Sequence, residues 1–131
     1  MKLIDIVNII ESLTIMSKLT LSAKDSFNLS NIIITFQNEV ILYDETKTKL
    51  CQKYGETEDG ITYKVDEQNQ PRFFKELYEL DNIEIDNIEI NKVQVPLSKI
   101  DELANKIGGI EPRHLINARK VIEIIDDTVL T

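Results

Sequence analysis

The chain has 131 residues, a formal net charge of −8 and a sequence pI of about 4.7. This length fits one domain with its own core, and a hydrophobic share of 42% is typical of a folded chain rather than a disordered one. Phosphate backbones attract clusters of Lys and Arg, and the sequence has no such cluster, so direct binding to nucleic acid is disfavoured. The acidity either suits a basic protein partner or serves solubility alone.

Cysteine content and hydropathy bear on the compartment. Cys51 is the only cysteine, which excludes an intrachain disulfide and a four-thiolate zinc site. The apolar N-terminal stretch is interrupted by Asp5, Asn8 and Glu11 and lacks a small-residue cleavage site, unlike a signal peptide. No apolar run reaches the length of a membrane span. We therefore expect a cytoplasmic protein without a membrane anchor.

Two helices are predicted over the first 55 residues. Residues 2–18 place apolar side chains at helical spacing. Ser22 is the expected N-cap of a second helix, with Asp25 in the capping-box position, and that helix runs to about Tyr54. Its steps of four and three residues make a heptad seam interrupted by Lys47. The seam residues, our candidate interface, are Leu29, Ile33, Phe36, Val40, Tyr43, Leu50 and Tyr54.

A helix of about 30 residues is roughly 45 Å long, more than one small globule needs. We therefore expect a second helix to cover the seam along its whole length, from the same chain or from another copy. A homodimer or higher oligomer through the hairpin follows from this interpretation.

The middle of the chain predicts short strands around one helix. Gly55 is the expected C′ residue of the long helix, Asp59 and Gly60 form a turn, and residues 61–65 alternate as a strand. Asn69 is the expected cap of a helix that begins near Pro71.

The stretch DNIEIDNIEI, at 81–90, repeats five residues, which is too short for a solenoid module and indicates chance duplication. Its apolar positions change parity at Asp86 and Asn87. We therefore predict a strand, a bulge or turn, and a second strand.

The last third predicts a strand at Val93 and Val95 that ends at Pro96, then two short helices. Ser98 is the expected cap of the first helix, which ends at Gly108 and Gly109; the second opens at Pro112 and continues through Ile125. The sequence thus predicts one mainly helical α+β domain, 1–131. It consists of a long antiparallel helical hairpin (1–55), a strand–helix–strand segment (56–97) that supplies a small antiparallel sheet, and short C-terminal helices (98–131).

No residue pattern predicts catalysis, a metal or a cofactor. His114 is the only histidine and lacks a nucleophile at a meaningful spacing, so we expect it at the surface or in a cap. The acidic residues before Gly60 do not fit the spacing of a calcium loop. Gly108 and Gly109, followed by Arg113 in a first helical turn, could cradle an anion or nucleotide, or form a plain turn.

Residues 22–97 resemble small phage and prophage proteins of unknown function from tailed phages of Gram-positive bacteria. The shared features are the long helix, KYGE at 53–56, the DG pair at 59–60 and FKELYEL at 74–80. The Asn/Ile/Lys-rich vocabulary also looks like that of a clostridial-type genome. The resemblance implies a phage or prophage origin and supplies no established catalytic residue.

Three functions follow as hypotheses. The first is a non-enzymatic protein that binds another protein, with an acidic inhibitor of a host defence or nucleic-acid-binding protein as one form. The second is a virion or assembly component that oligomerises through the long helix. The third is a sponge for a small nucleotide signal at Gly108, Gly109 and Arg113.

Overall fold

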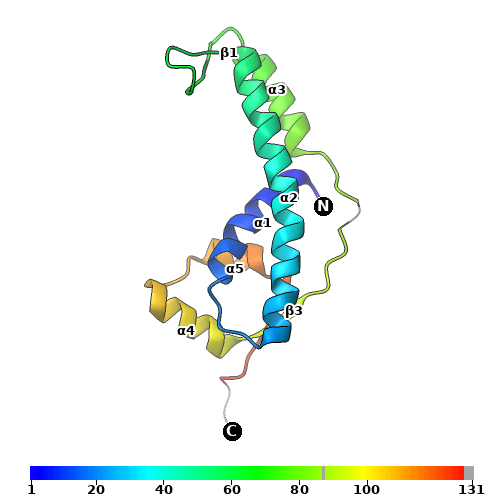
Figure 1. Ribbon diagram of the computed structural model, residues 1–131, viewed down its shortest axis with the longest axis vertical. Coiled ribbons are helices and arrows are strands. Elements are labelled where there is room, and N and C mark those ends of the chain that lie inside the picture. The colour runs from blue at the N-terminus through cyan, green and yellow to red at the C-terminus, as the bar shows by residue number, and fades with distance from the viewer. Residues whose placement is uncertain (87, 129–131) are drawn as a thin grey trace.

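The computed structural model describes residues 1–86 and 88–128 (Figure 1). The helices of this part are α1 (Leu3–Met16), α2 (Ala23–Tyr54), α3 (Gln70–Asp81), α4 (Leu97–Ile107) and α5 (Pro112–Ala118). The strands are β1 (Gly55–Glu56), β2 (Lys64–Val65), β3 (Val93–Pro96) and β4 (Ile122–Ile125). The expected mainly helical α+β class is confirmed.

The long helix α2 is continuous over 32 residues, and both of its ends have local causes. The Asp25 amide donates to Ser22 Oγ at 3.2 Å, which confirms the predicted N-cap. Gly55 ends the helix, but its φ of −109° is extended rather than left-handed. Glycine is required there for space instead, because a Cβ on Gly55 would lie 2.5 Å from the Cys51 carbonyl oxygen.

Asn69 occupies the N-cap position of α3, as predicted, but its side chain serves the end of α2. Its side chain makes no cap hydrogen bond to α3. Its Nδ2 instead donates to the Tyr54 carbonyl at 3.2 Å, which satisfies one of the carbonyls left free in the last turn of α2.

Two helices of the same chain cover α2 in succession. The short antiparallel helix α1 packs on its N-terminal half, and α3 packs on its C-terminal half (Figure 1). The seam lies under this cover: Leu29, Phe36 and Tyr43 are buried, and the other four seam residues, Ile33, Val40, Leu50 and Tyr54, are half-buried. The cover that the seam requires therefore comes from the chain itself, one of the two alternatives that the sequence left open.

The C-terminal half of α2 depends on a small core and two polar contacts with α3. Leu3, Tyr43 and Leu80 form this second cluster, separate from the main core around α1. Tyr43 Oη donates to Asp81 Oδ1 at 2.7 Å, and Lys53 Nζ lies 3.2 Å from Glu76 Oε1. Beyond them, β1 and β2 form the expected small antiparallel pair.

The strand expected over 61–65 is shorter than predicted. Only Lys64–Val65 pairs with β1, and Ile61 is 83% exposed. The cause is Asp59, whose Oδ1 accepts from the amides of Ile61 and Thr62 at 2.8 and 2.7 Å and holds both in the turn. These hydrogen bonds, that of Thr62 above all, lower the pKa of the Asp59 carboxyl to about 2.

The two strands predicted over 83–90 are wrong. The described residues there form only one isolated bridge, between Lys2 and Glu84, and the expected bulge falls partly on residue 87, outside the described part. The segment is extended without a neighbouring strand, and Ile85, Ile88 and Ile90 anchor it by packing on the core. Burial of alternate isoleucines thus explains the pattern that we read as strands.

The C-terminal third contains a second correction. Helix α5 ends at Ala118, and the region predicted to continue it through Ile125 contains β4. This strand runs parallel to β3, with Val93 opposite Ile122. Parallel neighbours need a long crossover, which α4 and α5 supply. Gly108, with a φ of +84°, ends α4 as predicted.

The predicted cap at Ser98 is also wrong. Pro96 occupies the N-cap position of α4, so Ser98 lies inside the first turn. The Ser98 amide donates to Asp127 Oδ1 at 2.8 Å, and its hydroxyl donates to Asp127 Oδ2. An acidic side chain from beyond β4 therefore satisfies the free donors of this helix start.

Candidate binding groove

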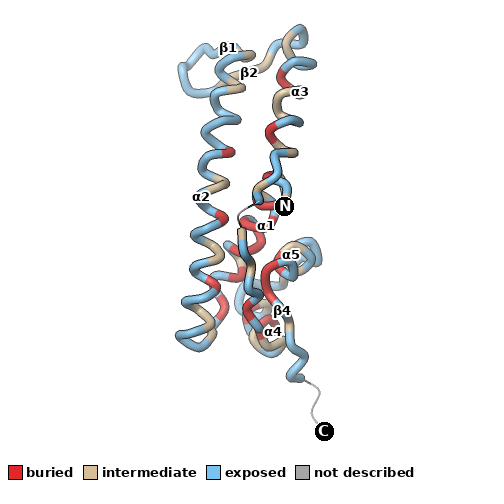
Figure 2. The backbone as a smooth tube through the Cα atoms, turned by 90° about the vertical axis from the view of Figure 1, so that its right-hand side faces the viewer, coloured by how far each residue is buried: buried red, intermediate tan, exposed pale blue. Residues whose placement is uncertain are grey.

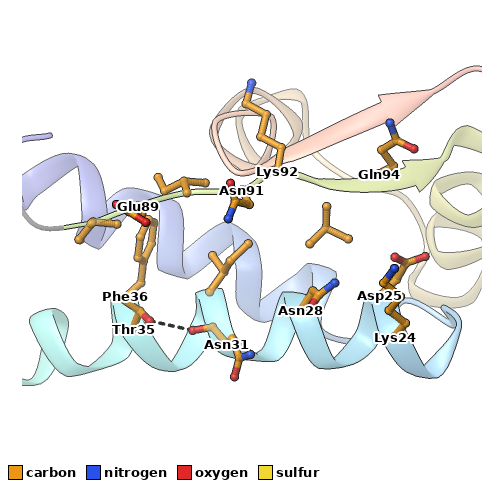
Figure 3. A pocket seen from close by; sticks show the side chains of 14 residues that line it. Lys24, Asp25, Asn28, Asn31, Thr35, Phe36, Glu89, Asn91, Lys92 and Gln94 are labelled. Atoms are coloured by element: carbon orange, nitrogen blue, oxygen red, sulfur yellow. Dashed lines mark hydrogen bonds between the residues drawn. The ribbon is translucent and has the colours of Figure 1, made fainter.

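A hollow lies between α2 and the segment 88–94 (Figure 3). We call it the groove; its volume is about 480 Å³, within the range of ligand sites. Its apolar lining comes from Ile32, Phe36, Ile88, Ile90 and Val93, and its polar lining from Lys24, Asp25, Asn28, Asn31, Thr35, Glu89, Asn91, Lys92 and Gln94.

The α2 wall has a polar row because of helical spacing. Lys24, Asn28, Asn31 and Thr35 follow one another at steps of four and three residues, which places them on one face. Thr35 Oγ1 donates to the Asn31 carbonyl at 2.9 Å, so the hydroxyl oxygen can still accept a hydrogen bond. The row thus offers hydrogen-bond donors and acceptors beside an apolar floor.

The opposite wall is an open strand edge. Val93 N donates to the Val121 carbonyl at 3.3 Å, toward the β4 side. Main-chain groups alternate in direction along a strand, so the N–H and C=O of Gln94 face away from β4. Residues 88–92 make no backbone hydrogen bond within the described part of the chain. The segment therefore presents main-chain groups that no neighbouring strand uses.

Side-chain directions separate the groove from the solvent face of this segment. In Figure 3, Asn91 points across the groove toward α2, and Asp25 points up from α2 toward the segment. Lys92 and Gln94 point away from α2. Asn91 and Asn28 are therefore the carboxamides that line both walls, and each amide offers two donors and an acceptor oxygen.

The groove is electrically balanced, unlike the chain around it. Among its lining residues, Lys24 and Lys92 are the cations and Asp25 and Glu89 the anions, with the Lys92 side chain at the outer rim, pointing away from α2. Their formal charges cancel, whereas the whole chain carries −8. A strongly charged ligand therefore finds no excess of opposite charge there, and a neutral polar ligand suits the lining better.

The anion cradle considered at Gly108, Gly109 and Arg113 receives no support from the geometry. The Arg113 guanidinium is paired with Glu111 at 2.6 Å and with Glu11 at 3.5 Å. Both carboxylates would repel an anion placed beside it. Hydrogen bonding to Glu111 raises the pKa of Arg113 and lowers that of Glu111, as expected for a salt bridge. The arginine thus joins α5 to α1.

His114 was expected at the surface or in a cap, and it is buried instead. Only 6% of it is exposed, and its Nδ1 lies 3.0 Å from the hydroxyl of Ser12, itself fully buried in α1. A serine beside a histidine resembles part of a hydrolytic site, but neither residue lines one of the larger hollows of the described chain. We therefore interpret the pair as a polar link between α1 and α5.

The described residues include neither a cluster for a metal ion nor a helix that could span a membrane. No group of three or more His, Cys, Asp or Glu side chains is arranged there to hold a metal ion. No helix in the described part is both long and apolar enough to cross a bilayer.

The chain matches no protein-family model, no curated protein and no solved structure.

Proposed function

We propose that this chain is a non-enzymatic protein-binding protein and that the groove receives an extended segment of its partner. The observation that carries this proposal is the unused main-chain edge at 88–94, which lines the groove together with the carboxamide row of α2. An extended peptide supplies main-chain donors and acceptors at strand spacing, which is what such an edge pairs with.

The dimensions of the groove set the length of the peptide. The α2 wall from Lys24 to Thr35 is about 16 Å long at 1.5 Å per residue. An extended chain rises about 3.3 Å per residue, so about five residues fit. The bound peptide would form a third strand beside β3 and would lie over Asn28. Pro96 has no N–H to donate to the peptide, so main-chain pairing with the peptide is confined to the residues before Pro96.

The charge distribution favours a particular kind of partner. The balanced groove suits a peptide of uncharged polar and small apolar residues, with alternate side chains toward the half-buried Ile32 and Ile90. The acidic surface elsewhere favours a protein that is basic around this peptide, because opposite potentials speed encounter. This preference fits an inhibitor of a host defence or nucleic-acid-binding protein.

The resemblance of residues 22–97 to phage and prophage proteins supports a partner from the infected host or from the phage itself. A virion or assembly component is the second candidate. A row of exposed apolar side chains on α2 favours it, because a structural component must contact other copies or other subunits.

A peptide library tests the groove. Random peptides of about seven residues, long enough to fill it, are selected against the purified protein, and the affinity of enriched peptides is measured by fluorescence polarisation. We expect the double variant Asn28→Ala, Asn91→Ala to weaken binding at least tenfold. Asn38→Ala removes an exposed carboxamide from α2 outside the groove and is the matched control.

Hydrogen exchange locates the bound peptide. Pairing with the edge should slow exchange of amides in 88–94, and proline substitution in the peptide should abolish binding by removing donors. Protection confined to other elements, or equal losses for Asn38→Ala and the groove variant, would refute the proposal.

A further inference from the structure

Helix α2 has a second apolar row that no other part of the described chain covers. Phe27, Ile34 and Ile41 recur every seven residues and are 67%, 56% and 54% exposed. We call them the outer stripe. Residues seven apart lie almost above one another on a helix, so the stripe is nearly straight. Large apolar side chains this exposed, aligned on one helix, mark an interaction surface.

The outer stripe is distinct from both other surfaces of α2. The seam is buried against α1 and α3, and the stripe residues do not line the groove. Figure 2 shows α2 with an exposed side turned away from α1 and α3. A partner can therefore reach the stripe without disturbing the core.

We propose that a second copy of this chain covers the outer stripe, with the two α2 helices antiparallel and Ile34 at the two-fold axis. In this arrangement Phe27 of each copy meets Ile41 of the other, and Ile34 meets Ile34. This inference stands on α2 alone; the contact shares Lys24 and Asn31 with the lining of the groove, but it does not require a peptide to be bound there. The outer stripe, and not the seam, is then the contact between copies, because α1 and α3 of the same chain cover the seam.

Charge determines the antiparallel orientation. Lys24 lies three residues before Phe27, and Glu45 lies four residues after Ile41, so they flank opposite ends of the stripe. Neither is ion-paired within the described part of the chain. Antiparallel packing brings Lys24 of one copy beside Glu45 of the other. Parallel packing would place Lys24 against Lys24 and Glu45 against Glu45.

The polar residues between the stripe positions also pair in the antiparallel arrangement. The two-fold axis at Ile34 brings Asn31 of each copy close to Asn38 of the other, on the same side of the contact. Carboxamides donate and accept, so these pairs satisfy one another across the contact. Polar residues in an otherwise apolar helix contact favour one register over its neighbours.

The available area predicts a weak dimer. With Ile34 at the axis, residues 23–45 of the two α2 helices overlap, a face about 33 Å long and about 10 Å wide, which gives roughly 330 Å² for each copy. A standard stable interface buries about 800 Å² per partner. We therefore expect dimerisation in the micromolar range, visible as a change of mass with concentration.

Sedimentation velocity and light scattering between about 1 and 300 µM test the contact. Ile34→Lys places two like charges at the two-fold axis and should weaken dimerisation at least tenfold. Ile116→Lys, at a position on α5 that is 64% exposed, is the matched control and should leave it unchanged. A wild-type monomer at every concentration, or an Ile34→Lys dimer as strong as wild type, overturns the proposal. Unchanged thermal unfolding confirms that each variant is folded.

Cysteine cross-linking distinguishes the orientations in a Cys51→Ser background. A mixture of Phe27→Cys and Ile41→Cys chains should form a disulfide between the two variants under mild oxidation, while Phe27→Cys alone should not cross-link. Lys24→Glu should weaken the dimer, and Glu45→Lys added to it should restore it. Self-cross-linking of Phe27→Cys would show a parallel dimer and refute the arrangement. Loss of dimerisation with peptide binding intact separates failure here from failure of the groove proposal.

Discussion

Replacing Tyr43 with phenylalanine tests what holds the C-terminal half of α2 against α3. The ring of Tyr43 is only 5% exposed, and its hydroxyl donates to Asp81 Oδ1 at 2.7 Å. The change Tyr43→Phe keeps the ring and removes the hydrogen bond. Such bonds to charged groups contribute about 1.5–3 kcal/mol. Water can replace part of this contact because Asp81 is half-exposed. We therefore expect the free energy of unfolding of the variant to be lower than that of wild type by about 1–2 kcal/mol at pH 7.

The pH dependence of this loss gives a sharper test. Burial, and then the hydrogen bond to Asp81, raise the pKa of Tyr43 from 10.0 to about 12. The unfolded chain therefore releases this proton first, and the advantage of wild type over Tyr43→Phe is full below pH 10 and falls between pH 10 and 12. With these two pKa values, about 1.4 kcal/mol of the difference disappears by pH 11.

Urea denaturation followed by circular dichroism at pH 7, 9, 10 and 11 measures this difference. Tyr78→Phe is the control: Tyr78 is 69% exposed, so this variant should keep almost the whole free energy of unfolding of wild type. An ultraviolet titration should also show one of the four tyrosines ionising late in wild type and absent from Tyr43→Phe. A difference between wild type and Tyr43→Phe that stays constant to pH 11, or an equal loss in Tyr78→Phe, would refute the reasoning.

Three further predictions concern stability. Ser12→Ala leaves the buried Nδ1 of His114 without its partner at 3.0 Å and should destabilise the fold by about 1–3 kcal/mol in urea, unlike the exposed Ser17→Ala. Gly55→Ala puts a Cβ 2.5 Å from a backbone oxygen and should cost about 1–3 kcal/mol in the same assay; an unchanged midpoint would show that the chain relaxes there. Amides of 44–54 should exchange faster than those of 29–43, because the smaller cluster covers that half of α2; uniform exchange would contradict this.

The parts of the fold that sequence predicted correctly depend on local signals. Ser22 caps α2 through an amide three residues away, and Gly55 and Gly108 end helices where they stand. Heptad spacing identified the buried face of α2 because α1, which precedes it by a short turn, packs on that face. Each of these features depends only on residues that are close together in the chain, so it can be recognised in a single sequence.

The features that sequence missed depend on distant partners. Residues 122–125 read equally well as the end of a helix, and only their pairing with Val93–Pro96 makes them a strand. The burial of His114 depends on Ser12, 102 residues away. The polar row at 28, 31 and 35 was visible in the sequence, but it becomes a groove wall only when the segment 88–94 is placed opposite it.

The outer stripe shows why heptad spacing alone was ambiguous. Helix α2 contains two such series, one through Phe36 and one through Ile34, and both have apolar side chains. The series through Phe36 is denser, with an apolar residue at nearly every step of three or four, so α1 and α3 pack there. The sparser series alternates with Ser, Asn and Gln, and it remains exposed. A core demands continuous apolar cover, whereas a reversible contact between copies tolerates interspersed polar residues.

One helix therefore carries three surfaces with separable consequences. A charge at Phe36 would lie in the core and unfold the domain, because burying an unpaired charge costs more free energy than the folding of the domain provides. A charge at Ile34 lies in water in the monomer and affects only a contact between copies. Loss of the Asn28 carboxamide leaves both the core and the stripe intact and affects only the groove. Because α2 is straight and continuous from one end to the other, these three changes can be made within nine residues of one another and still report on different interactions.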